Sequence, residues 1–115
     1  MKGVLPIIII CCFLIVSSSC RKSCAEGKVP ECITSTIESN KNSPEWGIET
    51  VDEYEFNGYL VYVFKPGPHS ADMFIQVLKD DCSEVCTLGG IMGIETCQGE
   101  KFYRKATYTR TIWTK

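Results

Sequence analysis

The sequence is short of the side chains on which several common functions depend. Its 115 residues include one histidine, His69, and its 12 lysines and arginines stand against 14 acidic residues. Without a basic excess, a nucleic acid is not an expected partner. There are no internal repeats and no low-complexity segment, so we expect one small domain. The apolar run at 4–16 is too short to cross a bilayer as a helix, which needs about 20 residues.

The first 19 residues have the pattern of a secretory signal instead. Lys2 supplies a positive start, the uncharged run at 4–16 follows, and small residues occupy 17–19. A short apolar core between a basic start and small residues is typical of a signal peptide. We predict cleavage before Cys20, which places the mature chain outside the cytoplasm.

Cys20 has two main interpretations. Ser18 and Ser19 before it fit a lipobox, in which the cysteine becomes the lipidated first residue, although Ser17 stands where leucine is common. The serines at 17 and 19 also fit ordinary signal peptidase, which would release the chain, and an uncleaved anchor is a third alternative. We expect lipidation at Cys20, a tether over 20–28 and anchoring to a membrane of the cell envelope. Secretion is the alternative.

The remaining cysteines predict disulfides. Cys11 and Cys12 belong to the signal peptide, which leaves an odd number for the fold, and Cys24 in the polar tether is the expected free thiol. Disulfides are expected outside the cytoplasm among the other four. These are Cys32, Cys82, Cys86 and Cys97. Three pairings exist and the sequence does not choose among them; we favour Cys86–Cys97, which closes a short loop, with Cys32–Cys82, which ties helix to sheet.

Catalytic and metal-binding patterns are weak. Cys82, Cys86, Cys97 and His69 are suitable zinc ligands, but disulfides are the better interpretation in an exported chain. The three-residue spacing between Cys82 and Cys86 is not that of a thioredoxin-type motif. Acids at 80–81 lack the spacing of a helix–loop–helix calcium site. We expect no metal and no cofactor.

A hydrolase triad would have to use Ser70, His69 and Asp72. Direct neighbours in sequence rarely converge as a triad requires. We therefore expect no catalytic residue and a protein that is not an enzyme.

One helix and one hairpin are the clearest local predictions. A helix over 30–41 has Pro30 in its first turn, where the missing N–H is no loss, and an apolar face at 3–4 spacing. In the hairpin over 51–64, Asn57-Gly58 suits a type I′ turn because both of its central residues need positive φ. The first strand alternates like an edge strand, and the second is apolar on both sides like an interior strand.

The rest of the chain is predicted to complete a small sheet. Strands are expected at 73–79, 84–88 and 107–114, a loop at 89–99, and a short helix at 100–105. The predicted fold class is α+β: one N-terminal helix packed on a small antiparallel sheet, a meander of hairpins, stapled by disulfides. This single domain covers 29–115.

Charge is segregated along the chain. Acids gather on the first strand and its approach, and bases gather in the last 15 residues. We expect the two groups to be neighbours that partly neutralise each other across strands. The alternative is a polar binding face.

Several motifs together resemble a family of small bacterial lipoproteins built on an uncharacterised domain. They are PECITSTIESNKNSPEW at 30–46, VDEYEFNGYLVYVFKPG at 51–67, the three cysteines and Gly-Gly loop within 78–97, and TIWTK at 111–115. The resemblance implies an envelope lipoprotein without an assigned activity, and it supplies no catalytic residues. Relatives often have a cysteine pair where this chain has PHSAD at 68–72, which leaves the disulfide pairing open.

The expected function is therefore a binding or structural role at the envelope, for an unknown protein or small-molecule partner. The alternative is a secreted, disulfide-stapled inhibitor or ligand-binding protein. Its contact surface would comprise the loops 66–72 and 87–99. The candidate contact residues of the first loop are Pro68, His69, Ser70 and Asp72.

Overall fold

The computed structural model describes residues 27–70 and 72–115. The predicted signal peptide, Cys20 and Cys24 lie outside the described residues. The elements are α2 (Glu31–Asn40), β1 (Ile48–Phe56), β2 (Tyr59–Pro66), η2 (Pro68–Ser70), β3 (Phe74–Leu78), β4 (Glu84–Gly89), β5 (Thr96–Cys97), β6 (Glu100–Lys101), α3 (Phe102–Lys105) and β7 (Thr107–Thr114). In this part of the chain, no helix has the length and apolar character needed to cross a membrane.

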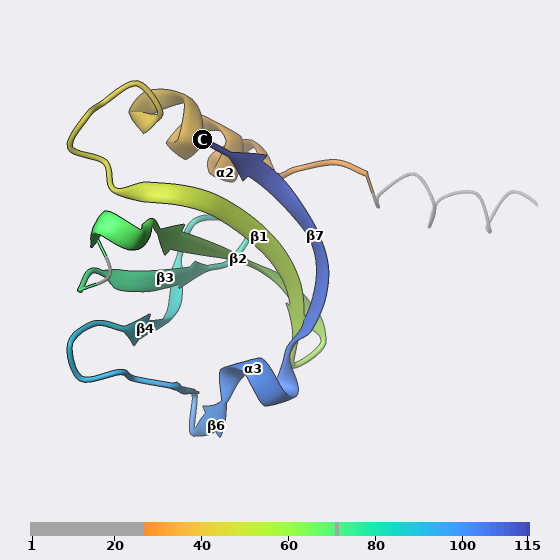
Figure 1. The fold of residues 1–115 in the computed structure, drawn as a ribbon. Coiled ribbons are helices and arrows are strands. Elements are labelled where there is room, and N and C mark those ends of the chain that lie inside the picture. Colours follow the sequence, from red (N-terminus) through yellow and green to blue (C-terminus); the bar gives the residue numbers. More distant parts are fainter. Residues whose placement is uncertain (1–26, 71) are drawn as a thin grey trace, which may run out of the picture.

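The molecule is a twisted five-stranded antiparallel sheet with cover on both faces (Figure 1). The strand order is β4-β3-β2-β1-β7, and β5 with β6 forms a separate two-stranded sheet. The helix α2 packs on one face, and the segment that includes α3 packs on the other. The predicted α+β class, with one N-terminal helix on an antiparallel sheet, is confirmed.

The two covers bury two apolar clusters. Under α2 lie Ile33, Ile37, Ile48, Val51, Tyr62, Phe64 and Leu78. On the opposite face lie Tyr54, Phe56, Val61, Val63, Val77, Leu88, Cys97 and Phe102. Successive side chains of a strand point to opposite faces, so neighbouring residues of β2 belong to different clusters. This is why β2 is apolar throughout its centre.

The hairpin has the predicted register. Phe56 lies opposite Tyr59 and Tyr54 lies opposite Val61. Asn57 and Gly58 have φ values of 52° and 90°, the positive values that a type I′ turn requires. The helix prediction is also confirmed, since α2 lies within the expected 30–41.

The prediction that the first strand is an edge strand is wrong. β1 pairs with β2 on one side and with β7 on the other, so it is interior, and the edges are β4 and β7. Two of the three acids at 52–55 are buried, Asp52 at 6% and Glu53 at 2% exposure, and Glu55 is exposed. The two buried acids tolerate burial because basic and hydroxyl side chains of the neighbouring strands pair with them. They are adjacent in the strand, so they point to opposite faces of the sheet and each has its own partners.

The segment 89–99 is more ordered than the predicted loop. Gly89 and Ile94 form an isolated β-bridge, and β5 and β6 pair around Gln98 and Gly99. Both turn residues have positive φ, 52° at Gln98 and 81° at Gly99. Glycine at these turns was visible in the sequence, but strands of two residues are too short to give a periodic signal.

Two disulfides staple the layers. Cys32 of α2 is bonded to Cys82 in the β3–β4 turn, and Cys86 of β4 is bonded to Cys97 of β5. These are the two bridges that we favoured among the three pairings that the sequence allows. The first joins the helix to the sheet and the second joins the sheet to the cover on its other face. Disulfides of this kind indicate an oxidising, extracytoplasmic compartment.

The two bridges are predicted to differ in their contribution to stability. The Cys32–Cys82 bridge spans 50 residues and the Cys86–Cys97 bridge spans 11. By loop-closure entropy, replacing both cysteines with serine should lower the free energy of unfolding by about 4 kcal/mol for the longer loop and about 3 kcal/mol for the shorter. Denaturant unfolding without reductant measures both; an equal or reversed order would contradict the chain-entropy explanation.

Candidate functional site

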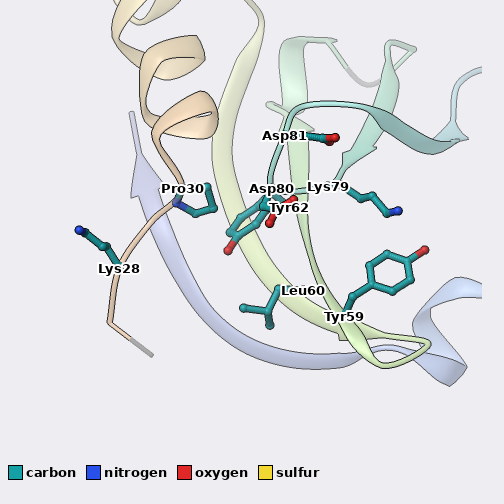
Figure 2. Close-up of a pocket in the computed structure, with 8 residues that line it drawn as sticks. All are labelled: Lys28, Pro30, Tyr59, Leu60, Tyr62, Lys79, Asp80 and Asp81. Atoms are coloured by element: carbon teal, nitrogen blue, oxygen red, sulfur yellow. The ribbon is translucent and has the colours of Figure 1, made fainter. Parts of the chain in front are cut away.

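A groove opens where the start of α2, the first half of β2 and the β3–β4 turn meet (Figure 2). We call it the α2–β2 groove; its volume is about 480 Å³. It is lined by Lys28, Pro30, Tyr59, Leu60, Tyr62, Lys79, Asp80 and Asp81. Leu60 and Tyr62 lie at its centre, with Lys28 on one side and Lys79 on the other.

The two walls of this groove are joined covalently. One wall is the start of α2 and the other is the turn after β3, and the Cys32–Cys82 disulfide links them. Within the turn, the amide of Cys82 donates to the carbonyl of Lys79 (3.0 Å), and the amide of Lys79 donates to the carbonyl of Ser83 (2.9 Å). The width of the groove is therefore set by a bridge and a closed turn.

The charges around the groove are held in place locally. The ammonium of Lys79 lies 4.9 Å from the ring centroid of Tyr59, within the range of a cation–π contact. Oδ1 of Asp81 accepts hydrogen bonds from both the hydroxyl and the amide of Ser83. These bonds, chiefly the one from the hydroxyl, lower the pKa of Asp81. Asp81 is consequently a carboxylate at neutral pH.

The floor of the groove rests on a buried polar network. The hydroxyl of Tyr62 donates to Oε2 of Glu53 at 2.9 Å. Arg110 donates to the same carboxylate twice, from Nε to Oε1 at 3.1 Å and from Nη2 to Oε2 at 3.3 Å. The bond to Glu53 is the main cause that raises the pKa of Arg110. This bidentate pair confirms, at one position, that the acids of the first strand and the bases of the last are neighbours.

The same arginine also holds the beginning of the domain. Its Nη1 donates to the carbonyl of Gly27 at 3.3 Å. A second hollow of about 420 Å³ lies on the other side of Leu60, lined by Glu53, Glu55, Leu60, Thr109 and Arg110. Leu60 therefore stands between two hollows on one face of the sheet, and it is 42% exposed.

The side chains of this face offer charged, polar and apolar contacts. Both oxygens of Glu53 accept hydrogen bonds, so its carboxylate is already engaged in structure. The rim offers cations at Lys28 and Lys79 and carboxylates at Asp80 and Asp81, while Leu60 offers an apolar contact. A ligand that combines an apolar side chain with charged groups, as a peptide segment does, matches this set. Among the described residues, no three His, Cys, Asp or Glu side chains gather as metal ligands.

The predicted contact loop lies elsewhere. Pro68, His69 and Ser70 form η2, which follows the end of β2, whereas the groove lies at its start. Asp72 follows η2, and both it and His69 are exposed. Ser70 packs beside Gly47, where a side chain would approach its hydroxyl oxygen to 2.8 Å. The structure does not bring these residues to the groove.

Sequence reasoning missed the groove because its residues come from three separate segments. Lys28 was expected in the tether, and Tyr59 to Tyr62 were interpreted only as strand residues. Asp80 and Asp81 were considered only as calcium ligands, and their spacing does not fit a calcium site. The favoured Cys32–Cys82 pairing brings the helix to the turn after β3, but nothing in the sequence indicates that a groove forms where they meet β2.

The chain matches a known family over most of this fold. Residues 36–115 match the family described as domain of unknown function DUF6970. The chain belongs to the DUF6970 family. No curated protein and no solved structure matches it. The match begins inside α2, so it includes three of the four bonded cysteines of this DUF6970 domain and most of the groove.

Removing Arg110 should destabilise this DUF6970 domain far more than removing a surface base. Arg110→Ala leaves Glu53, 2% exposed, without its cation. Because the arginine side chain is itself one-third exposed, we expect a loss of about 2–3 kcal/mol in the free energy of unfolding, below that of a fully buried pair. Lys105→Ala is the control, since its pair with Glu100 is exposed at both ends, and should cost under about 0.5 kcal/mol. Equal losses in denaturant unfolding would contradict the role of the network.

Tyr62 should be the last tyrosine to ionise. Burial, followed by the hydrogen bond to Glu53 and its charge, raises the pKa of Tyr62 far above the ordinary value of 10.0. The folded state keeps this proton while the unfolded chain loses it, so the contribution of Tyr62 to stability is complete below pH 10.0 and declines above it.

Ultraviolet titration of the five tyrosines tests this expectation. Tyr62→Phe should remove the most alkaline step, and Tyr108→Phe, at a position 53% exposed, should leave that step in place. Loss of the same step in both variants would contradict the assignment.

Proposed function

We propose that this DUF6970 protein is exported and lipid-anchored at Cys20, and that it binds a partner at the envelope without catalysis of its own. The observation that carries the proposal is the pair of disulfides in the domain that follows the signal-like residues. A chain with such bridges folds in an oxidising compartment. The run at 4–16 and the serines before Cys20 supply an export signal and a lipidation pattern.

The likeness to small bacterial envelope lipoproteins supports the same proposal. In that setting the tether over 20–28 joins the lipid to the domain, and its last residues already contact the fold. The carbonyl of Gly27 accepts from Arg110, and Val29 packs against the cluster under α2. The anchored chain would therefore enter the domain beside the α2–β2 groove. That entry point supports a position of the groove on the side of the domain that faces the anchor.

Binding at the α2–β2 groove is the role that its geometry supports best. Its walls are fixed by a disulfide, and its floor is fixed by the Glu53 network, so little ordering is needed when a ligand arrives. The contact face would use Leu60 as an apolar centre, with Lys28 and Lys79 beside it. A peptide segment of a neighbouring envelope protein is the proposed ligand class.

A secreted inhibitor or ligand-binding protein is the second candidate. The observation that favours it is the exposure of both predicted contact loops, η2 with Asp72 and the turn at 90–93. Protruding loops on a disulfide-stapled scaffold suit insertion into a partner's site. The two candidates differ in whether the mature chain carries a lipid.

Cys20→Ser should release the protein from membranes. Lipidation requires the thiol of Cys20, so the wild-type protein from its native host should fractionate with membranes and show an intact mass that begins at Cys20 and includes acyl chains. The variant should appear in the soluble exported fraction without the acyl mass. Cys24→Ser is the control, because it removes a thiol of the same tether and leaves the lipid site intact.

A bare N-terminus at Cys20 in the wild-type protein would overturn lipid anchoring and favour the secreted candidate. Thiol alkylation before mass measurement adds a second test. One alkylatable thiol, at Cys24, fits two disulfides together with a lipidated Cys20. A larger number would contradict that assignment.

A further inference from the structure

The face of the sheet that carries the α2–β2 groove holds more acids than bases. Four acids that line its depressions have no ion-pair partner in the described chain, and two bases there have none either. The acids are Glu31, Glu55, Asp80 and Asp81, and the bases are Lys28 and Lys79. Because Glu53 and Arg110 neutralise each other, two bases against four acids give this face a net formal charge of −2. The field over the face therefore favours a positively charged ligand.

Three depressions on this face share lining residues. Asp80 lines both the groove and a hollow of about 620 Å³ at the start of α2. Leu60 lines both the groove and the hollow of about 420 Å³ that borders β7 at Thr109 and Arg110. The surface is therefore open along a line that begins at the start of α2, passes Leu60 and ends at β7. An elongated ligand can follow this line without a break.

Leu60 has acids on both sides. Glu55 lies directly opposite Leu60 in the β1–β2 pair, so their side chains share one face of the sheet and their Cβ atoms are about 5 Å apart. Glu55 is exposed and lines the hollow toward β7. Asp80 and Asp81, both exposed, line the groove on the other side of Leu60. The order along the surface is therefore acid, apolar side chain, acid.

The two bases flank the groove and leave its centre negative. Figure 2 shows the ammonium of Lys28 pointing away from Asp80. The ammonium of Lys79 lies 4.9 Å from the ring centroid of Tyr59, and its charge also acts on Asp81. Asp80 therefore stands between two bases that are directed elsewhere, and its carboxylate is the group that a cationic ligand would meet at the centre of the groove.

We propose that the α2–β2 groove selects an extended basic peptide, in which an apolar side chain contacts Leu60, one base meets Asp80 and another meets Glu55. Alternate side chains of an extended peptide face the same side and are about 7 Å apart. The two bases therefore stand two residues before and two residues after the apolar one. This inference rests on the proposed binding of a peptide at the groove, and it adds the charge and the spacing of that peptide.

Fluorescence anisotropy of labelled peptides tests this preference on the exported chain, as its host processes it, in one non-ionic detergent throughout. Three heptapeptides share a central leucine and differ only two residues before and after it, where they hold lysine, glutamine or glutamate. At low salt the lysine peptide should bind at least about tenfold more tightly than the glutamate peptide, with the glutamine peptide between them. The difference should shrink in about 0.5 M salt, because exposed charges are then screened.

Neutral variants locate the two acidic contacts. Asp80→Asn and Glu55→Gln should each weaken binding of the lysine peptide by about threefold or more and leave the glutamine peptide nearly unchanged. Glu45→Gln is the matched control, because Glu45 is exposed and follows the end of α2, whereas the groove lies at its start. It should bind all three peptides as the wild-type protein does. The three positions are exposed, so the variants should fold, and circular dichroism verifies this.

Charge reversal separates a local contact from the field of the whole protein. Asp80→Lys should weaken the lysine peptide and tighten the glutamate peptide, because it places an ammonium at the centre of the groove. Glu45→Lys changes the net charge of the protein by the same amount at a distant position. It should leave the order of the three peptides as in the wild-type protein.

Equal binding of the three peptides, or tighter binding of the glutamate peptide, would overturn the basic preference, and so would equal effects of Asp80→Lys and Glu45→Lys. If the peptides bind without regard to charge and Leu60→Ser weakens all of them, peptide binding at the groove stands and only the charge preference fails. If none of the three binds at about 1 mM, the proposed peptide binding at the groove fails, and this inference fails with it.

Discussion

The pairing of β1 with β7 is the constraint on which the rest of the structure depends. The strands β1 to β4 form a simple meander, but the chain must then cross the sheet to place β7 against β1. This crossing carries Phe102 into the core and makes β1 interior. Both faces of the sheet are covered because the chain returns across one of them. Without this pairing, Glu53 would lose Arg110 and Asp52 would lose Thr111, and each would keep only its partner on β2.

The same pairing connects stability to the candidate site. Arg110 reaches Glu53 only because β7 lies beside β1, and it then holds the start of the domain through Gly27. The carboxylate also accepts from Tyr62, which forms the floor of the α2–β2 groove. One buried charge therefore ties together the sheet, the groove and the entry of the chain. A network in which every member is paired favours a single arrangement of such a site.

Local features were predictable from the sequence, and distant contacts were not. The Asn57-Gly58 turn, the helix with Ile33 and Ile37 on one face, and the strand at 107–114 carry signals within a few residues. The interior position of β1 carries none, because acidic side chains on a strand look the same whether solvent or a partner strand neutralises them. The groove was missed for a similar reason, since its walls come from segments that are far apart in the sequence and are joined by the Cys32–Cys82 disulfide. The sequence left three cysteine pairings open, and the favoured one is the one in the structure.

The Cys32–Cys82 bridge also determines what a protease could remove. It spans α2, β1, β2 and β3, so a single cut between Cys32 and Cys82 leaves both pieces covalently joined. The N-terminal piece would remain attached through Cys82 to the rest of the chain. A nick in the connection after α2 or in the η2 loop therefore severs the backbone without shedding the domain. Release from whatever holds the N-terminus requires a cut before Cys32. A cut between Cys32 and Cys82 achieves it only if the bridge is also reduced.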